Sequence, residues 1–231
     1  MSAFVIRYEF SQGGVTKAFN ISLDPKTLLN TAPTPETPPA WAKLSFEKCS
    51  NCPLREEDSP SCPAALTLSE VVASFAHIFS YERVSARVTV AERVYEQVDV
   101  SVQEALSSLL GVYMTTSGCP VLAKLRPMVR FHLPFATELE TVTRTTSMYL
   151  LSQYLVAQDG GTPDWSLEGL SKNYEATSVV NRAFAKRLRA AATKDANVNA
   201  LIRLDSVARS VPELIESQMD ELRFLFGPLE K

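Results

Sequence analysis

The sequence predicts an α+β fold, in which an N-terminal antiparallel sheet of two β-hairpins with a helix precedes a C-terminal helical bundle. Two observations predict it. Apolar and polar residues alternate in two pairs of segments within residues 1–101, and apolar residues recur at helical spacing through residues 102–231. We therefore expect an α+β region over 1–101 and a bundle over 102–231, with one compact unit held together by the cysteines as the alternative.

The first hairpin is expected from residues 4–10 and 15–23, in which apolar side chains recur at every second position except Lys17. The connection, 11–14, ends in two glycines, which adopt the positive φ of a tight turn without steric cost. Residues 84–90 and 94–100 alternate in the same way and predict the second hairpin.

The segment between the hairpins combines an irregular part with a helical part. Residues 24–40 contain five prolines, which exclude a helix or a central strand because proline lacks the amide donor. We expect an extended loop leading to Trp41, whose ring anchors it on the core; a loose linker is the alternative. Apolar spacing then predicts a helix over 64–80.

The second half is expected to be helical throughout. The expected helices span 102–116, 119–131, 137–158, 174–193, 197–210 and 213–226. In 137–158 one apolar face includes Leu139, Val142 and Tyr154, and the loop over 162–170 is expected to be held by Trp165. Residues Ile215, Met219, Leu222 and Phe226 form a seam that packs within the bundle or against a second subunit.

Charge and hydropathy exclude several classes of partner. The net charge of −3 lacks the excess of Lys and Arg on which nucleic-acid binding depends. A basic cluster over 182–189 is expected to be a solvated helix face, with a local nucleic-acid contact as the alternative. No apolar stretch is long enough to span a bilayer, and Arg7 and Glu9 interrupt any leader, so we expect a cytoplasmic protein with a protein partner.

The four cysteines predict a metal site. Cys49, Cys52 and Cys62 lie within 14 residues, and Cys119 follows in the helical half. Thiols stay reduced in the cytoplasm, and four converging thiolates are typical of zinc or iron–sulfur centres, which this spacing does not distinguish. The alternative is that Cys62 and Cys119 are small buried hydrophobic residues.

The function predicted from these cysteines is metal binding. A Cys49–Cys52–Cys62–Cys119 site, with zinc or an iron–sulfur cluster as cofactor, would join the α+β region to the bundle in a protein that acts through protein interaction. The cellular role and any catalytic residue stay unknown.

A second candidate site contains Arg126, Arg130 and His132, which lie in an apolar segment. Buried together near Cys119, they could bind an anionic cofactor in an iron–sulfur redox protein or enzyme. The alternative is structural: the arginines would cap helix ends or pair with Glu138 and Glu140, and His132 would be a hydrogen-bonded core residue.

The chain resembles an uncharacterised bacterial protein family of unknown function over almost its whole length. The stretches that carry the resemblance are 5–23, the Cys49–Pro53 and Cys62–Pro63 loop, Ser117–Pro120, 125–136 and 147–151. The resemblance implies a bacterial origin and indicates no activity or cofactor.

Overall fold

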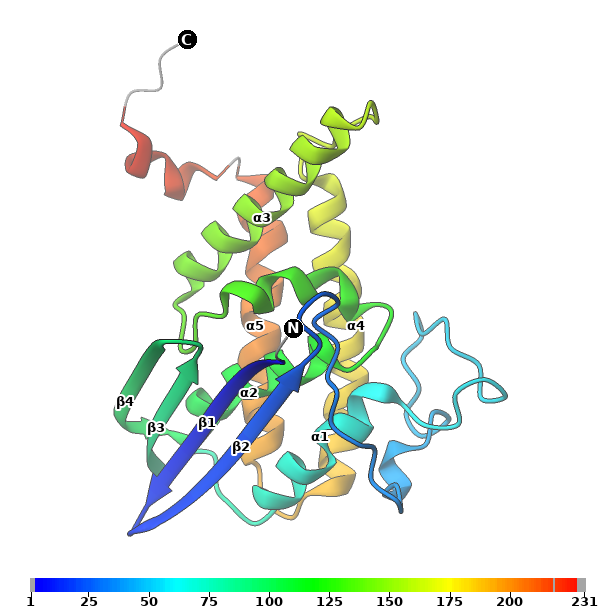
Figure 1. Cartoon of the computed structure of the whole chain (residues 1–231), viewed down its shortest axis with the longest axis vertical. Coiled ribbons are helices and arrows are strands. Elements are labelled where there is room, and N and C mark those ends of the chain that lie inside the picture. Colours follow the sequence, from blue (N-terminus) through cyan, green and yellow to red (C-terminus); the bar gives the residue numbers. More distant parts are fainter. Residues whose placement is uncertain (1–2, 218, 228–231) are drawn as a thin grey trace.

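A four-stranded antiparallel sheet forms the N-terminal part of the computed structural model, which describes residues 3–217 and 219–227. The strands are β1 (Phe4–Gln12), β2 (Val15–Leu23), β3 (Arg83–Val90) and β4 (Arg93–Ser101), in the order β2-β1-β3-β4. Both predicted hairpins are confirmed, and the first strands of the two hairpins pair at the centre of the sheet (Figure 1).

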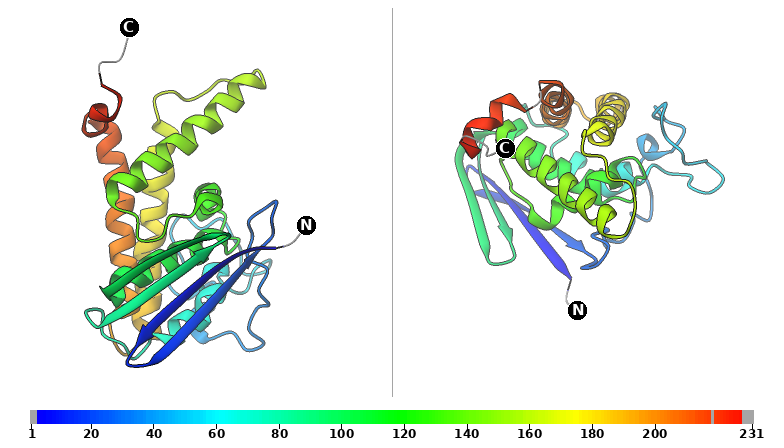
Figure 2. Two further views of the ribbon diagram at one scale, coloured as in Figure 1. Left: turned by 60° about the vertical axis from the view of Figure 1, so that its left-hand side comes forward. Right: turned by 90° about the horizontal axis from the view of Figure 1, so that it is seen from above.

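The sheet buries one face only. Ile6, Tyr8 and Phe10 alternate along β1 and are at most 3% exposed, whereas Val5 and Arg7 point to the opposite, solvated face. The helices lie on the buried side (Figure 2). The alternation of apolar and polar residues therefore predicted the buried face of the sheet correctly, because neighbouring side chains on a strand point to opposite faces.

Both hairpin turns contain residues with positive φ, but they use different residue types. Gly13 and Gly14 have φ of +56° and +82°, as the sequence predicted. The second hairpin turns at Ala91, which reaches φ of +51° despite its side chain.

Five α-helices and three 3₁₀ segments make up most of the remaining structure described. They are η1 (Ala40–Ala42), α1 (Pro63–Ser74), α2 (Val102–Thr116), η2 (Leu122–Phe131), α3 (Glu138–Gln158), α4 (Glu168–Ala191), α5 (Ala196–Glu216) and η3 (Asp220–Phe226). Helix α2 lies at the centre, with the sheet on one side and α5 on the other, and α5 packs along α4. The predicted α+β class with a helical second half is confirmed.

Several helices differ from the prediction. Helix α4 begins at Glu168, within the loop predicted over 162–170, and the helix expected over 119–131 is the 3₁₀ segment η2. Helix α1 ends at Ser74 instead of continuing to 80. The helix expected over 197–210 continues through Pro212 to Glu216 as α5, because Ala208 and Val211 are buried there, and most of the helix expected over 213–226 is instead the 3₁₀ segment η3. In η3, Leu222 is buried but Phe226 is 65% exposed, so the predicted apolar seam is not continuous.

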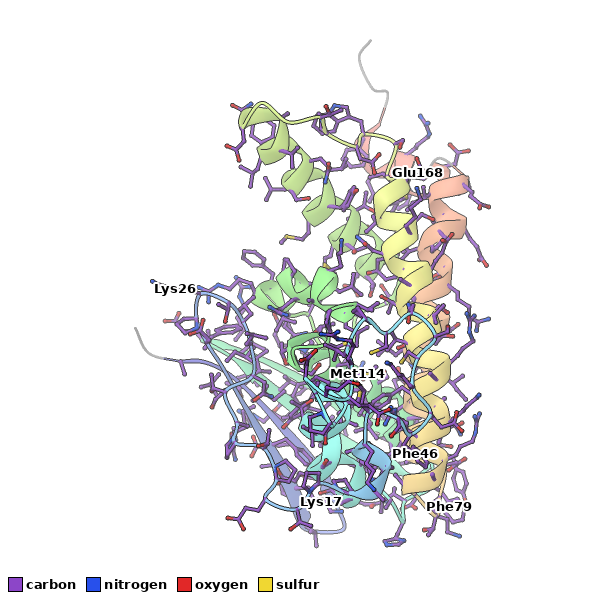
Figure 3. The ribbon with its side chains drawn as sticks, turned by 90° about the vertical axis from the view of Figure 1, so that its right-hand side faces the viewer. Lys17, Lys26, Phe46, Phe79, Met114 and Glu168 are labelled. Atoms are coloured by element: carbon purple, nitrogen blue, oxygen red, sulfur yellow. The ribbon has the colours of Figure 1, made fainter. Side chains whose placement is uncertain are left out.

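The proline-rich segment is anchored by an aromatic contact and by a buried cation. The Trp41 ring meets the Phe184 ring of α4 edge-on, with centroids 6.4 Å apart, which confirms the expected anchor. Arg187, only 1% exposed, donates to the carbonyl oxygens of Trp41, Lys43 and Leu44 at 2.7–3.0 Å. Figure 3 shows Phe46 beside α4, where Arg187 lies 6.0 Å from its ring centroid. Part of the predicted solvated basic face is thus buried.

Helix α3 packs along only part of its length. Val142, Thr145 and Thr146 are buried, whereas Leu151, Tyr154 and Leu155 beyond them are more than half exposed. The far end of α3 extends away from the body of the protein (Figure 2).

The loop after α3 is held differently from the prediction, because the Trp165 ring is 56% exposed. Asp164 holds the loop instead by accepting hydrogen bonds from the Tyr149 hydroxyl and the Gly169 amide. In the described parts of the chain, no helix combines the length and apolar character needed to cross a membrane.

Candidate functional site

A cavity of about 350 Å³ lies where α2, η2, α3 and α5 meet, with Tyr174 of α4 at its base. Its apolar wall comes mainly from η2, the loop after it and α5. The ionisable and hydroxyl side chains lining it are Glu104, Ser107, Ser108, Thr115, His132, Thr137, Glu138, Thr141, Arg144, Tyr174, Arg203 and Ser206. The volume lies in the range of small-molecule sites, and the lining combines apolar and polar side chains.

Arg144 is the central cation of this wall. One guanidinium nitrogen, Nη2, donates to the backbone oxygens of Met128 and Phe131 at 3.2 and 3.0 Å. No described carboxylate lies within 4.0 Å of its nitrogens. Burial lowers the pKa of Arg144, and the charge of Glu140 opposes that effect. The guanidinium remains charged at neutral pH, so the wall carries a half-buried cation without a close anion.

Two of the acidic side chains near the cavity, Glu140 and Glu104, are engaged in other contacts, and a third, Glu138, lines the cavity without a described ion pair. Glu140 accepts hydrogen bonds from the backbone and hydroxyl of Thr137, in a capping box that starts α3. Glu104, at the other end of the cavity, pairs with Arg203 at 3.3 Å. Neither carboxylate forms a described ion pair with Arg144, although the charge of Glu140 acts on the pKa of Arg144.

A hydrogen-bonded chain of three side chains connects the cavity wall to the sheet. The Tyr8 hydroxyl of β1 lies 2.6 Å from His132 Nε2 and 3.0 Å from Ser108 Oγ of α2. Ser108 Oγ also accepts a long hydrogen bond, 3.4 Å, from the Phe135 amide. Ser108 and His132 line the cavity, and Tyr8 lies behind them with no exposed surface.

Neither ionisable member of this chain titrates near neutral pH. Burial lowers the pKa of His132 to about 3, and the charge of Arg144 adds to the shift. Burial raises the pKa of Tyr8 above its usual range. Efficient general acids and bases have pKa values near the working pH, and Ser108 contacts Tyr8 rather than the imidazole. In this arrangement neither His132 nor Tyr8 has the pKa of an efficient general acid or base at neutral pH.

The loop that carries His132 into the wall contains a strained residue. Phe135 lines the cavity with φ of +59°, a left-handed conformation that non-glycine residues rarely adopt. Such conformations cost about 1–3 kcal/mol and are concentrated at functional sites. The strain is consistent with a loop fixed by the needs of the cavity.

The predicted group of Arg126, Arg130 and His132 is not assembled in one place. Only His132 lines the cavity. Arg126 donates to the backbone oxygens of Thr115 and Thr27, and Arg130 stacks over the Phe4 ring at 4.9 Å in a separate surface hollow. The alternative of pairing with Glu138 or Glu140 is absent from the described ion pairs. A cofactor role for these residues stays a prediction.

The predicted four-cysteine metal site is corrected by the structure. No group of three or more Cys, His, Asp or Glu side chains in the described chain could hold a metal ion. All four cysteines are free. Cys49, Cys62 and Cys119 instead pack as partly buried side chains against the main core, which is the alternative considered for Cys62 and Cys119. The predicted metal-binding function, with zinc or an iron–sulfur cluster, thereby loses the site on which it depended.

Local backbone structure explains where each cysteine lies. Cys49 and Cys52 share one turn, in which the Cys52 amide donates to the Cys49 carbonyl at 3.0 Å. Cys62 precedes the first turn of α1, and Cys119 follows the end of α2. Burial raises the pKa of Cys49 to about 11, with further contributions from the other three cysteines, and burial also raises that of Cys119. Both are thiols at neutral pH, and thiols are poor ligands and nucleophiles.

Sequence reasoning missed Tyr8 and Ser108 as site residues. Tyr8 is separated from His132 by 124 positions and follows the ordinary alternation of a core strand. In the sequence, Ser108 cannot be distinguished from the other polar residues of α2. The available signal was His132 within an apolar segment, since a buried imidazole requires a hydrogen-bond partner.

Comparison with curated proteins and with solved structures gave no significant match. A protein-family model does match, over residues 4–227 and hence over both the sheet and the helices. The bacterial origin, the cytoplasmic location and the protein partner stay predictions. The chain belongs to the family described as "Domain of unknown function (DUF6901)".

Proposed function

We propose that the protein binds a small organic anion with an apolar body in the cavity between α2, η2, α3 and α5. The observation that carries the proposal is Arg144, a half-buried cation on the cavity wall with no described carboxylate within 4.0 Å. A buried charge without a counter-ion is unfavourable. An anionic ligand would remove that cost on binding.

The remaining surface of the cavity supports a ligand with an apolar part. Met128, Val129 and Leu133 line one side, and Leu204 and Val207 of α5 line another. An anion with a hydrocarbon body would gain from burial there, at about 25 cal/mol per Å² of apolar surface removed from water.

The test compares the binding of probes that share one hydrocarbon chain. Octanoate and octyl phosphate should raise the melting temperature of the protein and give measurable heats in calorimetric titration. Octylamine, with the same chain and the opposite charge, should do neither. Equal binding of octylamine would contradict a site built around Arg144.

Arg144→Gln should weaken octanoate binding at least about tenfold, since a lost charge-assisted hydrogen bond is worth roughly 1.5–3 kcal/mol. Arg126→Gln is the matched control, because Arg126 is also half-buried and donates to two backbone oxygens but lies outside the cavity. Binding that survives Arg144→Gln, or falls equally in both variants, would overturn the proposal.

A further inference from the structure

The directions of the hydrogen bonds behind the cavity wall determine what His132 presents to a ligand. Three polar atoms are involved: Ser108 Oγ, the Tyr8 hydroxyl and His132 Nε2. The Tyr8 phenol keeps its proton at neutral pH because it is fully buried. The question is which of its two neighbours receives that proton.

Donation from Tyr8 to His132 Nε2 gives a partner to each of these three atoms. Ser108 then donates to the Tyr8 oxygen and accepts from the Phe135 amide. In the reverse arrangement, His132 donates to Tyr8 and Tyr8 donates to Ser108. The Ser108 proton then has no acceptor among the described side chains and backbone. Each arrangement leaves one donor facing the cavity, either the Ser108 hydroxyl or His132 Nδ1–H. The 2.6 Å separation of the Tyr8 oxygen and His132 Nε2 is shorter than the roughly 2.7–3.2 Å of an N–H···O hydrogen bond and fits an O–H donor, so the first arrangement is favoured.

This arrangement fixes the tautomer of His132. If Nε2 accepts a hydrogen bond, the proton of the neutral imidazole is on Nδ1. The ring is neutral because burial and the charge of Arg144 lower its pKa to about 3. No described residue accepts from Nδ1, and His132 lines the cavity whereas Tyr8 does not. The cavity wall therefore contains an N–H donor without a protein acceptor.

A second donor lies beside it. The Arg144 guanidinium donates to the carbonyl oxygen of Phe131, the residue before His132, at 3.0 Å. Only Nη2 of that guanidinium has described partners, so its other nitrogens remain available. One cation and one neutral donor on adjacent parts of the wall match a group with one negative charge and two acceptor oxygens.

We propose that the cavity selects a carboxylate, whose two oxygens accept hydrogen bonds from His132 Nδ1–H and from Arg144, and that Tyr8 is a positioning residue that holds the required tautomer. The proposal rests on the proposed function and names its ligand class. A phosphate monoester is disfavoured, because Arg203, the other arginine in the lining, is paired with Glu104, and Glu138 also lines the cavity.

The tautomer can be measured directly because the chain has only two histidines. Long-range ¹H–¹⁵N spectra distinguish the two neutral tautomers, and His132→Gln assigns the signals. We expect His132 in the Nδ1–H form in the native protein. In Tyr8→Phe the fixed tautomer should be lost. The signal of His77, which bonds Thr193 on another part of the surface, should not move.

Octanoate binding provides the second readout. Without the Tyr8 hydroxyl, Nδ1 can become an acceptor that opposes the carboxylate, so Tyr8→Phe should weaken octanoate binding about tenfold or more. Tyr113→Phe is the matched control: Tyr113 is 7% exposed on α2, outside the cavity lining. Circular dichroism establishes that both variants are folded.

The outcomes separate the two proposals. Binding of octanoate with His132 in the Nε2–H form, or unchanged affinity in Tyr8→Phe, would overturn the carboxylate proposal and leave anion binding in place. Equal affinities for octyl phosphate and octanoate would also overturn the carboxylate proposal and leave anion binding in place. If none of the octyl anions binds, both proposals are wrong.

Discussion

Two arginines illustrate how differently a protein can bury the same charge. Arg187 of α4 and Arg144 of α3 both lack an ion pair among the described residues, and both donate to backbone oxygens. Arg187 is almost fully buried, and two of its nitrogens are directed at three carbonyl groups of one loop. Arg144 is half-buried beside a cavity and uses one nitrogen. The comparison suggests that Arg187 serves stability, whereas Arg144 remains available for a ligand.

The loop contacts of Arg187 give the largest expected change in stability. Arg187→Ala should lower the free energy of unfolding by about 3–5 kcal/mol, because three carbonyl oxygens lose their buried donor. Urea unfolding measures the change. Arg189→Ala, an exposed neighbour on the same helix, should stay within about 0.5 kcal/mol of the parent. If Arg187→Ala lowers the free energy of unfolding by less than about 1 kcal/mol, Arg187 does not serve stability and its contrast with Arg144 is wrong.

The pH dependence of stability tests whether the Arg144 charge is uncompensated. The pKa of His132 is about 3 in the folded protein and near 6.5 when unfolded, so the unfolded chain takes up the proton first. The contribution of the neutral His132 ring to the free energy of unfolding is therefore fully present above about pH 6.5 and is lost as the pH falls toward 3. At about pH 4.5 the loss from this residue should be roughly 2–3 kcal/mol.

His132→Gln, which still offers Tyr8 an acceptor, should remove this part of the acid sensitivity. Arg144→Gln should reduce it, because one cause of the shift disappears. His77→Gln, a change at an exposed histidine, is the control. Parallel stability–pH curves for the parent and His132→Gln would show that His132 is not buried as a neutral ring.

The helix cap of α3 gives the smallest expected effect. Thr137→Ala should cost about 1 kcal/mol of stability, because the Glu140 amide loses its side-chain acceptor. It also frees the Glu140 carboxylate from the Thr137 hydroxyl. The freed Glu140 carboxylate should then compete with octanoate for Arg144 and so weaken octanoate binding. Thr143→Ala, which removes a hydroxyl that bonds the Leu139 carbonyl of the same helix, should leave octanoate affinity unchanged.

The local pattern of apolar and polar residues was sufficient to predict most of the helices and strands. Helix α2 begins and ends at the expected residues because its apolar stripe is complete and a glycine follows its last turn. Pro212 misled the prediction of α5, since proline usually ends a helix. Burial of Ala208 and Val211 outweighs that preference here. Tertiary packing of this kind cannot be read from one segment alone.

The site was less accessible to sequence reasoning than the fold. The spacing of Cys49 and Cys52 is correct for one turn, but the correct spacing along a chain does not provide a group of ligands in space. His132 was identified because an imidazole is unusual in an apolar segment. Its partner Tyr8 was not, because a tyrosine in a core strand has no unusual local pattern.

The partial packing of α3 has a consequence for local unfolding. Its first turns are capped by Thr137 and held to η2 through Arg144, whereas the turns beyond Leu151 have exposed apolar side chains. Opening should therefore start at the far end, near the Asp159–Gly161 loop, and proceed toward the cavity. Amide hydrogen exchange along α3 would then show a gradient, with the slowest amides in the turns nearest Arg144. The cavity would persist in partly opened molecules, because the loosest part of α3 is the part farthest from it.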